Sequence, residues 1–194
     1  DRDLDAEWGV SSFDRRHQLT GNLSVDFPFG PNRRWLTNGG TWAALLSDWS
    51  VSMSLSAQSG TPFTARLVGA ASDVARGTNG TLRADFTGAA ISIDKPTLLR
   101  FFNTSAFVVP PPGTFGSAAR NTIVGPGQQQ VDASIARDVR LSGSQVVSIQ
   151  LQATNLFNSV RFGATDTVVN SPTFGQVITI RPMRTVQLGV RFRF

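Results

Sequence analysis

The sequence of 194 residues contains no cysteine, a single histidine and a single lysine. Without cysteine, disulfide bonds and thiolate metal sites are excluded. Because His17 is the only histidine, the chain lacks the parts for a histidine-based metal site or a catalytic triad, and we interpret it as a residue at a strand end. We therefore expect no catalytic residues, no metal and no cofactor.

Long apolar runs are also missing. No stretch approaches the roughly 18 consecutive apolar residues of a membrane-spanning helix. The first residues lack the basic and apolar regions of a signal peptide, so we expect a mature chain or a fragment of a longer one. A transmembrane β-barrel remains compatible with this composition, because alternating apolar and polar residues average to a low hydropathy in each strand.

The net charge of +5 does not indicate nucleic acid as a partner. Apart from Lys95, the eighteen basic residues are arginines scattered along the chain. Their densest spots, residues 15–17 and 33–34, lie beside predicted strand ends, where anchoring at a membrane interface explains them as well as polyanion binding. We therefore expect no nucleic-acid partner.

Acidic residues alternate at the start of the chain, at Asp1, Asp3, Asp5 and Glu7. This spacing can place carboxylates on one side of a strand for a hard cation. The stretch lacks the glycine turn and the bidentate glutamate of a calcium loop. A solvated loop is therefore the favoured interpretation.

The clearest positive signal is strict alternation in residues 184–194. One set of positions is apolar: Val186, Leu188, Val190, Phe192 and Phe194. The other set is hydrophilic: Thr185, Gln187, Gly189, Arg191 and Arg193. Period two predicts a strand with one apolar face and one hydrophilic face. In a soluble protein such a strand would be a sticky edge, whereas lipid on one side and water on the other explain both faces.

Four further segments alternate in the same way: 17–29, Trp49–Gln58, 131–141 and 147–157. Each has about the length that a tilted strand needs to cross a bilayer. The hydrophilic faces supply candidates for a wall that faces a lumen: Asp132, Asp138, Arg140, Gln150, Gln152, Arg191 and Arg193. Arg137 falls on the apolar face, where an arginine in mid-bilayer costs about 2–4 kcal/mol. We therefore expect it near an interface or displaced by a bulge.

The connections between these segments are unequal. Residues 141–145 form a tight turn, and residues 30–45 carry Trp35 and Trp42, which with Trp49 we interpret as interfacial aromatics. Residues 59–130 form a long region rich in small residues and proline, which we interpret as an extracellular loop region within a single barrel segment spanning 1–194. If the last strand ends at the periplasmic rim, every short link lies on the periplasmic side and every long link on the extracellular side.

Five strands cannot close a bacterial barrel, which has an even number of at least eight. Either the weaker segments 61–67, 102–109 and 174–180 add strands, or the chain is the tail of a larger barrel. We favour the tail.

Several motifs occur along the chain in a fixed order: FDRRHQLTGN at 13–22, SAQSGTPF at 56–63, FFNTSAFVVP at 101–110, RNTIVGPG at 120–127, NLFN at 155–158 and the last strand. In these motifs the chain resembles the C-terminal barrel of Oar-like TonB-dependent receptors. The resemblance implies a 22-stranded barrel, of which this chain supplies about the last five strands. It also implies TonB-powered uptake of a bulky extracellular ligand, with the plug domain outside this chain. Such barrels use tyrosine heavily in their aromatic girdles, and here Phe and Trp take its place.

The resemblance further implies that the last strand carries the signal read by the barrel assembly machinery, in Leu188, Val190, Phe192 and Phe194. Recognition would proceed by addition of a strand to an open edge. The same residues also suit plain contact with lipid. The two roles are compatible.

The sequence thus predicts an all-β protein, an antiparallel transmembrane β-barrel portion in contact with the lipid of a Gram-negative type of outer membrane. Two alternatives stay open: a complete small barrel that acts as an adhesin or passive pore, and a soluble β-sandwich that binds glycans or proteins. In a sandwich, Leu23, Val51, Ile149 and Val190 would converge on a buried centre.

Overall fold

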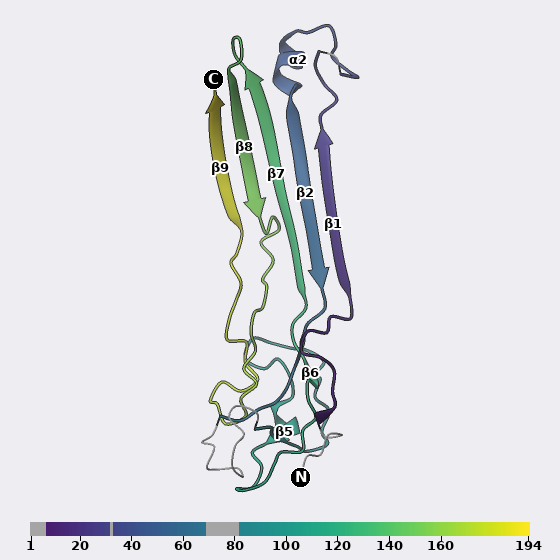
Figure 1. Ribbon diagram of the computed structural model, residues 1–194, viewed down its shortest axis with the longest axis vertical. Coiled ribbons are helices and arrows are strands. Elements are labelled where there is room, and N and C mark those ends of the chain that lie inside the picture. The colour runs from purple at the N-terminus through teal and green to yellow at the C-terminus, as the bar shows by residue number, and fades with distance from the viewer. Residues whose placement is uncertain (1–6, 32, 69–81) are drawn as a thin grey trace. The chain divides into compact units, whose positions relative to one another are not determined.

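The computed structural model describes residues 7–31, 33–68 and 82–194 (Figure 1). The chain folds into two compact units, each made of three segments. Unit 1 comprises Asp1–His17, Gln58–Gln128 and Arg161–Arg181, and unit 2 comprises Gln18–Ala57, Gln129–Val160 and Pro182–Phe194.

Unit 2 is a five-stranded sheet. Its strands are β1 (Gln18–Asp26), β2 (Trp49–Gln58), β7 (Gln128–Arg140), β8 (Val146–Thr154) and β9 (Thr185–Arg193), in the order β1-β2-β7-β8-β9. Neighbouring arrows run in opposite directions in Figure 1. The five predicted strands are therefore confirmed, with their ends shifted by a few residues. In the described part of the chain the sheet is open, with β1 and β9 at its edges, and does not close into a barrel.

The register of β8 with its two neighbours is continuous. Pairs run from Ala133 and Ala153 to Arg140 and Val146 on one side. On the other side they run without interruption along the whole of β8 and β9. Directly paired residues share a face of a sheet. The pairing therefore aligns apolar rows, such as Ile135, Leu151 and Leu188, and hydrophilic rows, such as Asp138, Ser148 and Arg191.

The apolar face of this sheet is exposed. Leu23, Ile149 and Val190 have 58%, 39% and 68% of their surface accessible, Val51 is half-buried, and every residue of β9 is exposed. These side chains do not converge on a buried centre. The arrangement that a soluble sandwich requires is therefore not present in unit 2.

The strand connections differ in length at the two ends of the sheet. At one end, β1 and β2 are joined through the short helix α2 (Thr41–Leu46), and β7 and β8 through a turn that the Leu141 amide closes on the Gln145 carbonyl at 3.0 Å. Gly143 takes a φ of 63° in that turn. At the other end, every strand continues into a segment of unit 1. Among the described residues, no helix has the length and apolar character to cross a membrane.

The described residues of unit 1 form only short strands. β3 (Pro62–Phe63) pairs with β6 (Ile123–Val124), and β4 (Asp85–Phe86) pairs with β5 (Phe107–Val108), which follows the 3₁₀ turn η1 (Thr104–Ala106). The weaker segments 61–67 and 102–109 thus hold two-residue strands, and 174–180 makes isolated bridges. None of them joins the five-stranded sheet. The alternative that we did not favour, in which these segments add strands to the sheet, does not hold, because they pair within unit 1.

Unit 1 nevertheless has a core of its own. Seven residues form it: Ala65, Ala84, Phe102, Ala106, Phe107, Ala118 and Ile123. The Phe102 ring meets Phe174 edge-on at 5.3 Å between centroids. Glycine allows the backbones to approach closely, since a Cβ on Gly116 would lie 2.0 Å from the Arg83 carbonyl oxygen. The 59–130 region, which we expected as a loop, is therefore packed where the structure describes it.

Asp166 is a buried carboxylate in this unit, only 8% exposed. Burial alone would raise its pKa. Hydrogen bonds from the side chains of Ser171 and Thr173 and from the Val168 amide, together with the charge of Arg66, outweigh burial and lower the pKa below its ordinary 3.8. The Thr173 hydroxyl donates at 2.6 Å and the Val168 amide at 2.9 Å. The ionised carboxylate therefore stabilises the fold of this segment.

We expect Asp166→Asn to lower the stability of unit 1 at pH 7 by about 1–3 kcal/mol, the usual loss for hydrogen bonds to a charged group. Because the folded pKa lies below the ordinary value, the contribution is complete above pH 3.8 and disappears as the pH falls through the folded pKa. Urea unfolding followed by hydrogen exchange of peptides from Arg161–Arg181 measures both effects. Asp94→Asn, at an exposed position of the same unit, is the control. Equal stability of the two variants at pH 7 would contradict the assignment.

Candidate functional site

The predicted lumen-facing residues share one face of the sheet. The register places Gln150 and Gln152 with Asp138 and Arg140, and β9 adds Arg191 and Arg193. Asp132 and Gln152 line a hollow of about 370 Å³ together with hydroxyl groups from three strands, those of Ser24, Ser52, Ser54 and Ser134. The Ser24 and Ser52 hydroxyls lie 3.2 Å apart. The structure thus brings the predicted set together as one hydrophilic surface. That this surface faces a lumen stays a prediction.

One ion pair lies on this surface. An Arg193 Nη2 lies 3.8 Å from Asp138 Oδ2, and the Ser148 hydroxyl donates to Asp138 Oδ1 at 2.5 Å. Both ionic side chains are more than half exposed. An exposed pair of this kind adds little stability, so its main effect is to keep the surface well hydrated.

The three predicted interfacial tryptophans gather at the end of the sheet with the short links. Trp42 lies in α2 and is 70% exposed, and Trp35 is 51% exposed. The Arg34 guanidinium lies 5.4 Å from the centre of the Trp35 ring. The Trp49 indole donates to the Leu45 carbonyl oxygen at 2.9 Å. The structure places these rings at one rim, and their contact with lipid headgroups stays a prediction.

Arg137 lies on the apolar face, in one row with Ile149 and Val190. The continuous register excludes a bulge between β7 and β8 at this point. The side chain sits three residues before the end of β7, with its guanidinium 5.5 Å from the centre of the Trp49 ring and a hydrogen bond to the Ala44 carbonyl oxygen. The charge is thus directed to the rim. Of the two alternatives, the register shows no bulge against β8. The position three residues before the end of β7 suits the other alternative, and nearness to a membrane interface stays a prediction.

The residues of the predicted barrel-assembly signal lie on the edge strand β9 and just after it. Leu188, Val190, Phe192 and Phe194 are 70%, 68%, 51% and 92% exposed. Their common face is the apolar one, and the Phe192 and Phe194 rings lie 6.0 Å apart. Their position suits strand addition or lipid contact. Recognition by the assembly machinery stays a prediction.

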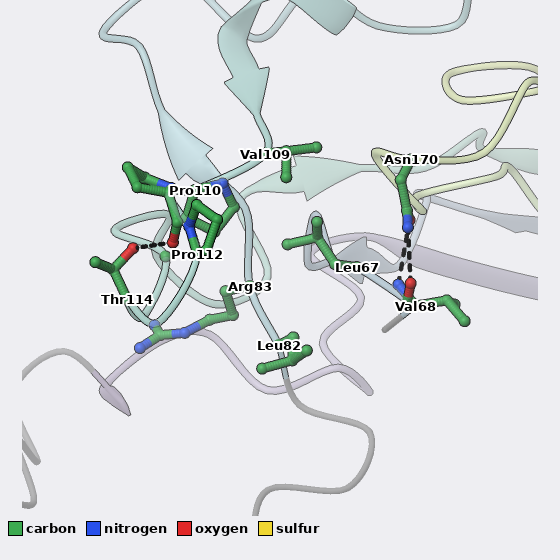
Figure 2. A pocket seen from close by; sticks show the side chains of 11 residues that line it. Leu67, Val68, Leu82, Arg83, Val109, Pro110, Pro112, Thr114 and Asn170 are labelled. Carbon is green, nitrogen blue, oxygen red and sulfur yellow. Dashed lines mark hydrogen bonds between the residues drawn. The ribbon is translucent and has the colours of Figure 1, made fainter. Parts of the chain in front are cut away.

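Unit 1 contains a cavity that the sequence patterns did not indicate (Figure 2). It has a volume of about 280 Å³, and its lining is mostly apolar: Leu67, Val68, Leu82, Val109, Pro110, Pro111 and Pro112, with Arg83, Thr114, Gly116 and Asn170. Asn170 fixes one wall, since its amide donates to the Val68 carbonyl at 2.7 Å and accepts from the Val68 amide at 3.2 Å. The Thr114 hydroxyl closes the proline turn on the Pro111 carbonyl at 2.7 Å.

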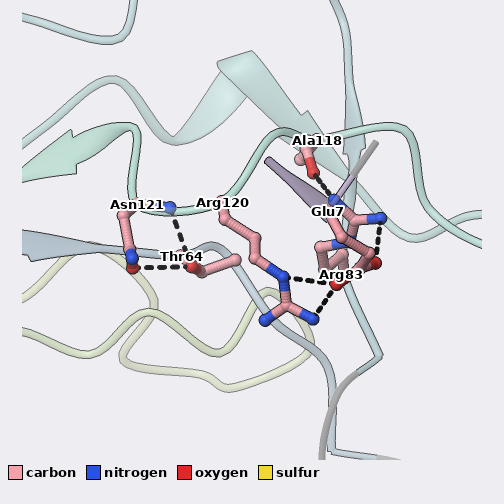
Figure 3. A network of polar contacts seen from close by, with 6 residues as sticks. All are labelled: Glu7, Thr64, Arg83, Ala118, Arg120 and Asn121. Carbon is pink, nitrogen blue, oxygen red and sulfur yellow. Dashed lines mark hydrogen bonds and ion pairs between the residues drawn. The ribbon is translucent and has the colours of Figure 1, made fainter. Parts of the chain in front are cut away.

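Arg83 also belongs to a polar network (Figure 3). Its Nη2 lies 2.8 Å from Glu7 Oε1, and Nε of Arg120 donates to Glu7 Oε2 at 2.5 Å. Arg83 Nη1 donates to the Ala118 carbonyl at 3.1 Å. The Arg83 side chain is 11% exposed, so its charge needs a partner. Glu7 is thus paired with two arginines, although its side chain stays 43% exposed, as expected for a solvated position. Asp1, Asp3 and Asp5 lie outside the described residues.

The remaining polar candidates have simple placements. His17 lies directly before β1, as predicted for a strand end, and its amide donates to the Ser59 hydroxyl at 3.1 Å. Arg15 donates to the Gln58 side chain at 2.7 Å. Over the described ranges, no group of three or more His, Cys, Asp or Glu side chains is placed to hold a metal ion.

The chain matches a known family over most of its length. Residues 1–187 match the sequence model of the outer membrane beta barrel domain. Neither the curated proteins nor the solved structures contain a significant match to the chain.

We expect Arg137→Leu to loosen α2, because it removes the ring contact with Trp49 and the hydrogen bond to Ala44. A cation–π contact at a site of this exposure contributes about 0.5–1 kcal/mol. Faster hydrogen exchange of the amides of Ala44 and Ser47, which bond to Gly40 and Ala43, would report the change. Arg140→Leu, on the opposite face, is the matched control. Unchanged exchange in Arg137→Leu would show that the arginine does not hold the helix.

Proposed function

The chain belongs to the outer membrane beta barrel domain family and so forms part of a β-barrel in the outer membrane; from this premise we propose that it supplies adjacent strands and outer loops of a larger TonB-dependent receptor. The observation that carries the proposal is the open five-stranded sheet with an exposed apolar face and a hydrophilic opposite face. In this proposal unit 2 is a section of barrel wall. Unit 1 contacts the extracellular ligand.

The two faces of unit 2 support the role as wall. Apolar rows continue across β7, β8 and β9, and their side chains are half-buried in β7 and exposed in β9. A contiguous apolar surface of this kind marks a partner or a membrane. Acyl chains supply an apolar environment for the rows, and the opposite serines, glutamines and charged residues then line water.

The open edges support membership of a larger barrel. An unpaired strand edge in hydrocarbon leaves amide and carbonyl groups without hydrogen bonds, at several kcal/mol for each group. In the described ranges, β1 and β9 have a neighbour on one side only. The short strands of unit 1 do not supply the missing neighbours. We therefore infer that the missing neighbours of β1 and β9 are further strands of the same receptor. The resemblance to Oar-like receptors implies 22 strands in total.

The strand connections support an orientation. All segments of unit 1 join the strands at one end, and α2 and the tight turn lie at the other. Outer-membrane barrels have short periplasmic turns and long extracellular loops. Unit 1 is accordingly placed outside the cell. The tryptophan-rich rim is placed at the periplasmic interface.

The proposal includes the partners that such a receptor needs. These are outer-membrane lipid, the barrel assembly machinery acting on the last strand, a TonB system acting through a plug domain beyond this chain, and a bulky extracellular ligand. It includes no nucleic acid and no catalytic activity.

Leu151→Arg and Gln152→Arg test which face of the sheet meets lipid. The two residues are adjacent in β8 and point to opposite faces. We expect Leu151→Arg to cost about 2–4 kcal/mol of folding free energy in a bilayer, because the charge meets acyl chains. Gln152→Arg should cost little, because its charge meets water. Heat-modifiable gel migration of the full-length receptor, after refolding into vesicles, measures the folded fraction. An equal loss in both variants, or a larger loss in Gln152→Arg, would argue against the wall.

The gene sequence before the codon for Asp1 tests the larger barrel. We expect the reading frame to continue upstream through further alternating strands and a plug domain. A signal peptide that ends directly before Asp1 would instead favour a complete small barrel. Uptake measurements in cells with and without TonB then test the transport step.

A further inference from the structure

Two arginines of unit 1 converge on a single carboxylate. Glu7 reaches Arg83 with one oxygen and Arg120 with the other. The three residues come from distant parts of the sequence (Figure 3). The structure therefore contains a formed site for one carboxylate group, and a side chain of the protein itself occupies it.

The same arginine connects this carboxylate site with the apolar cavity. Arg83 contributes to the cavity wall beside Leu82 and Thr114 (Figure 2). Figure 2 shows the Arg83 guanidinium pointing away from Leu67 and Leu82. Its Nη2 lies 2.8 Å from Glu7 Oε1. An apolar space with one guanidinium at its border is complementary to a small molecule with an apolar chain and a terminal acid.

We propose that this cavity binds a small amphiphilic carboxylate. Its apolar chain lies among Leu67, Leu82, Val109 and the prolines 110–112. Its carboxylate replaces that of Glu7 on Arg83 and Arg120.

The solvent exposure of Glu7 and Arg120 allows a ligand carboxylate to replace that of Glu7. The Glu7 side chain is 43% exposed and that of Arg120 35%, so water screens their attraction and Glu7 is held weakly. Arg83 is the least exposed of the three side chains, at 11%, so water screens its attraction to an anion the least. Glu7 thus acts as an internal competitor. It keeps Arg83 neutralised when no ligand is bound and lowers the apparent affinity for external carboxylates.

This inference rests on the proposed function only in placing unit 1 in the outer medium, and it assigns unit 1 a small-molecule site in addition to its contact with the bulky ligand. The test therefore uses binding to purified protein and does not involve uptake.

Hexanoate is the probe, and hexanamide is its uncharged counterpart. The full-length protein is placed in nanodiscs of phosphatidylcholine, and binding is followed by saturation-transfer NMR titration. We expect hexanoate to bind and hexanamide to bind at least about fivefold more weakly. Glu7→Gln should tighten hexanoate binding by about fivefold, since it removes the competitor.

Arg120→Gln should weaken hexanoate binding in both the wild-type and the Glu7→Gln background. Arg181→Gln removes an equal charge from an exposed position of unit 1 and should leave binding unchanged. Hydrogen exchange around the Thr64–Asn121 hydrogen bond, 2.9 Å long, checks that unit 1 stays folded. If Glu7→Gln unfolds unit 1, hexanoate binding by Arg120→Gln and by Arg181→Gln, each in the otherwise wild-type chain, is compared instead to test the site.

Equal binding of hexanoate and hexanamide would overturn the inference. So would equal binding by Arg120→Gln and Arg181→Gln, or unchanged affinity in a folded Glu7→Gln variant. Absence of hexanoate binding, with TonB-dependent uptake intact, would contradict only the carboxylate site. Hexanoate binding without such uptake would support the site and contradict the receptor function.

Discussion

Backbone pairing of β8 with both β7 and β9 is the constraint on which the rest of unit 2 depends. A shift of one residue in either register would move a whole row of side chains to the opposite face. In the observed registers, Leu151 lies between Ile135 and Leu188, and Ser148 lies between Asp138 and Arg191. The pairing therefore converts alternation within single strands into one continuous apolar surface and one continuous hydrophilic surface. Membership of an outer-membrane barrel requires this separation.

The two units are stabilised in different ways. Unit 1 has a dry core around Phe102, Phe107 and Ile123, and its buried Asp166 is held by hydrogen bonds. Unit 2 exposes most of its large apolar side chains, and its stability depends on interstrand hydrogen bonds and on whatever covers the apolar surface. In the proposed barrel wall, lipid would take the place in unit 2 that protein atoms take in unit 1. For this reason the same sequence contains both alternating strands and a compact, irregular part.

The parts of the structure that could be predicted from the sequence are those encoded locally. Alternation along ten residues is enough to locate β2 and β9 and to assign each residue to a face. The core of unit 1 has no such period, since Ala65, Phe107 and Ile123 meet only after the long region has folded. The pairing of Glu7 with Arg83 spans 76 positions and leaves no pattern in either neighbourhood. The placement of Arg137 could be predicted only in part. The cost of an arginine in lipid indicated a position near an interface, but nothing in the sequence indicated its contact with Trp49.

The preference for arginine over lysine follows from these contacts. A guanidinium is planar, stacks on aromatic rings and can bridge carboxylate oxygens, whereas an ammonium group is a compact point charge. Arg34 and Arg137 place the guanidinium carbon over the rings of Trp35 and Trp49. Arg83 and Arg120 use the donor groups against Glu7. A basic composition that at first suggests polyanions is thus used for separate, directional contacts at the rim of unit 2 and inside unit 1. In unit 1, the two arginines that hold the carboxylate of Glu7 are also the groups that accept an external carboxylate in our proposal.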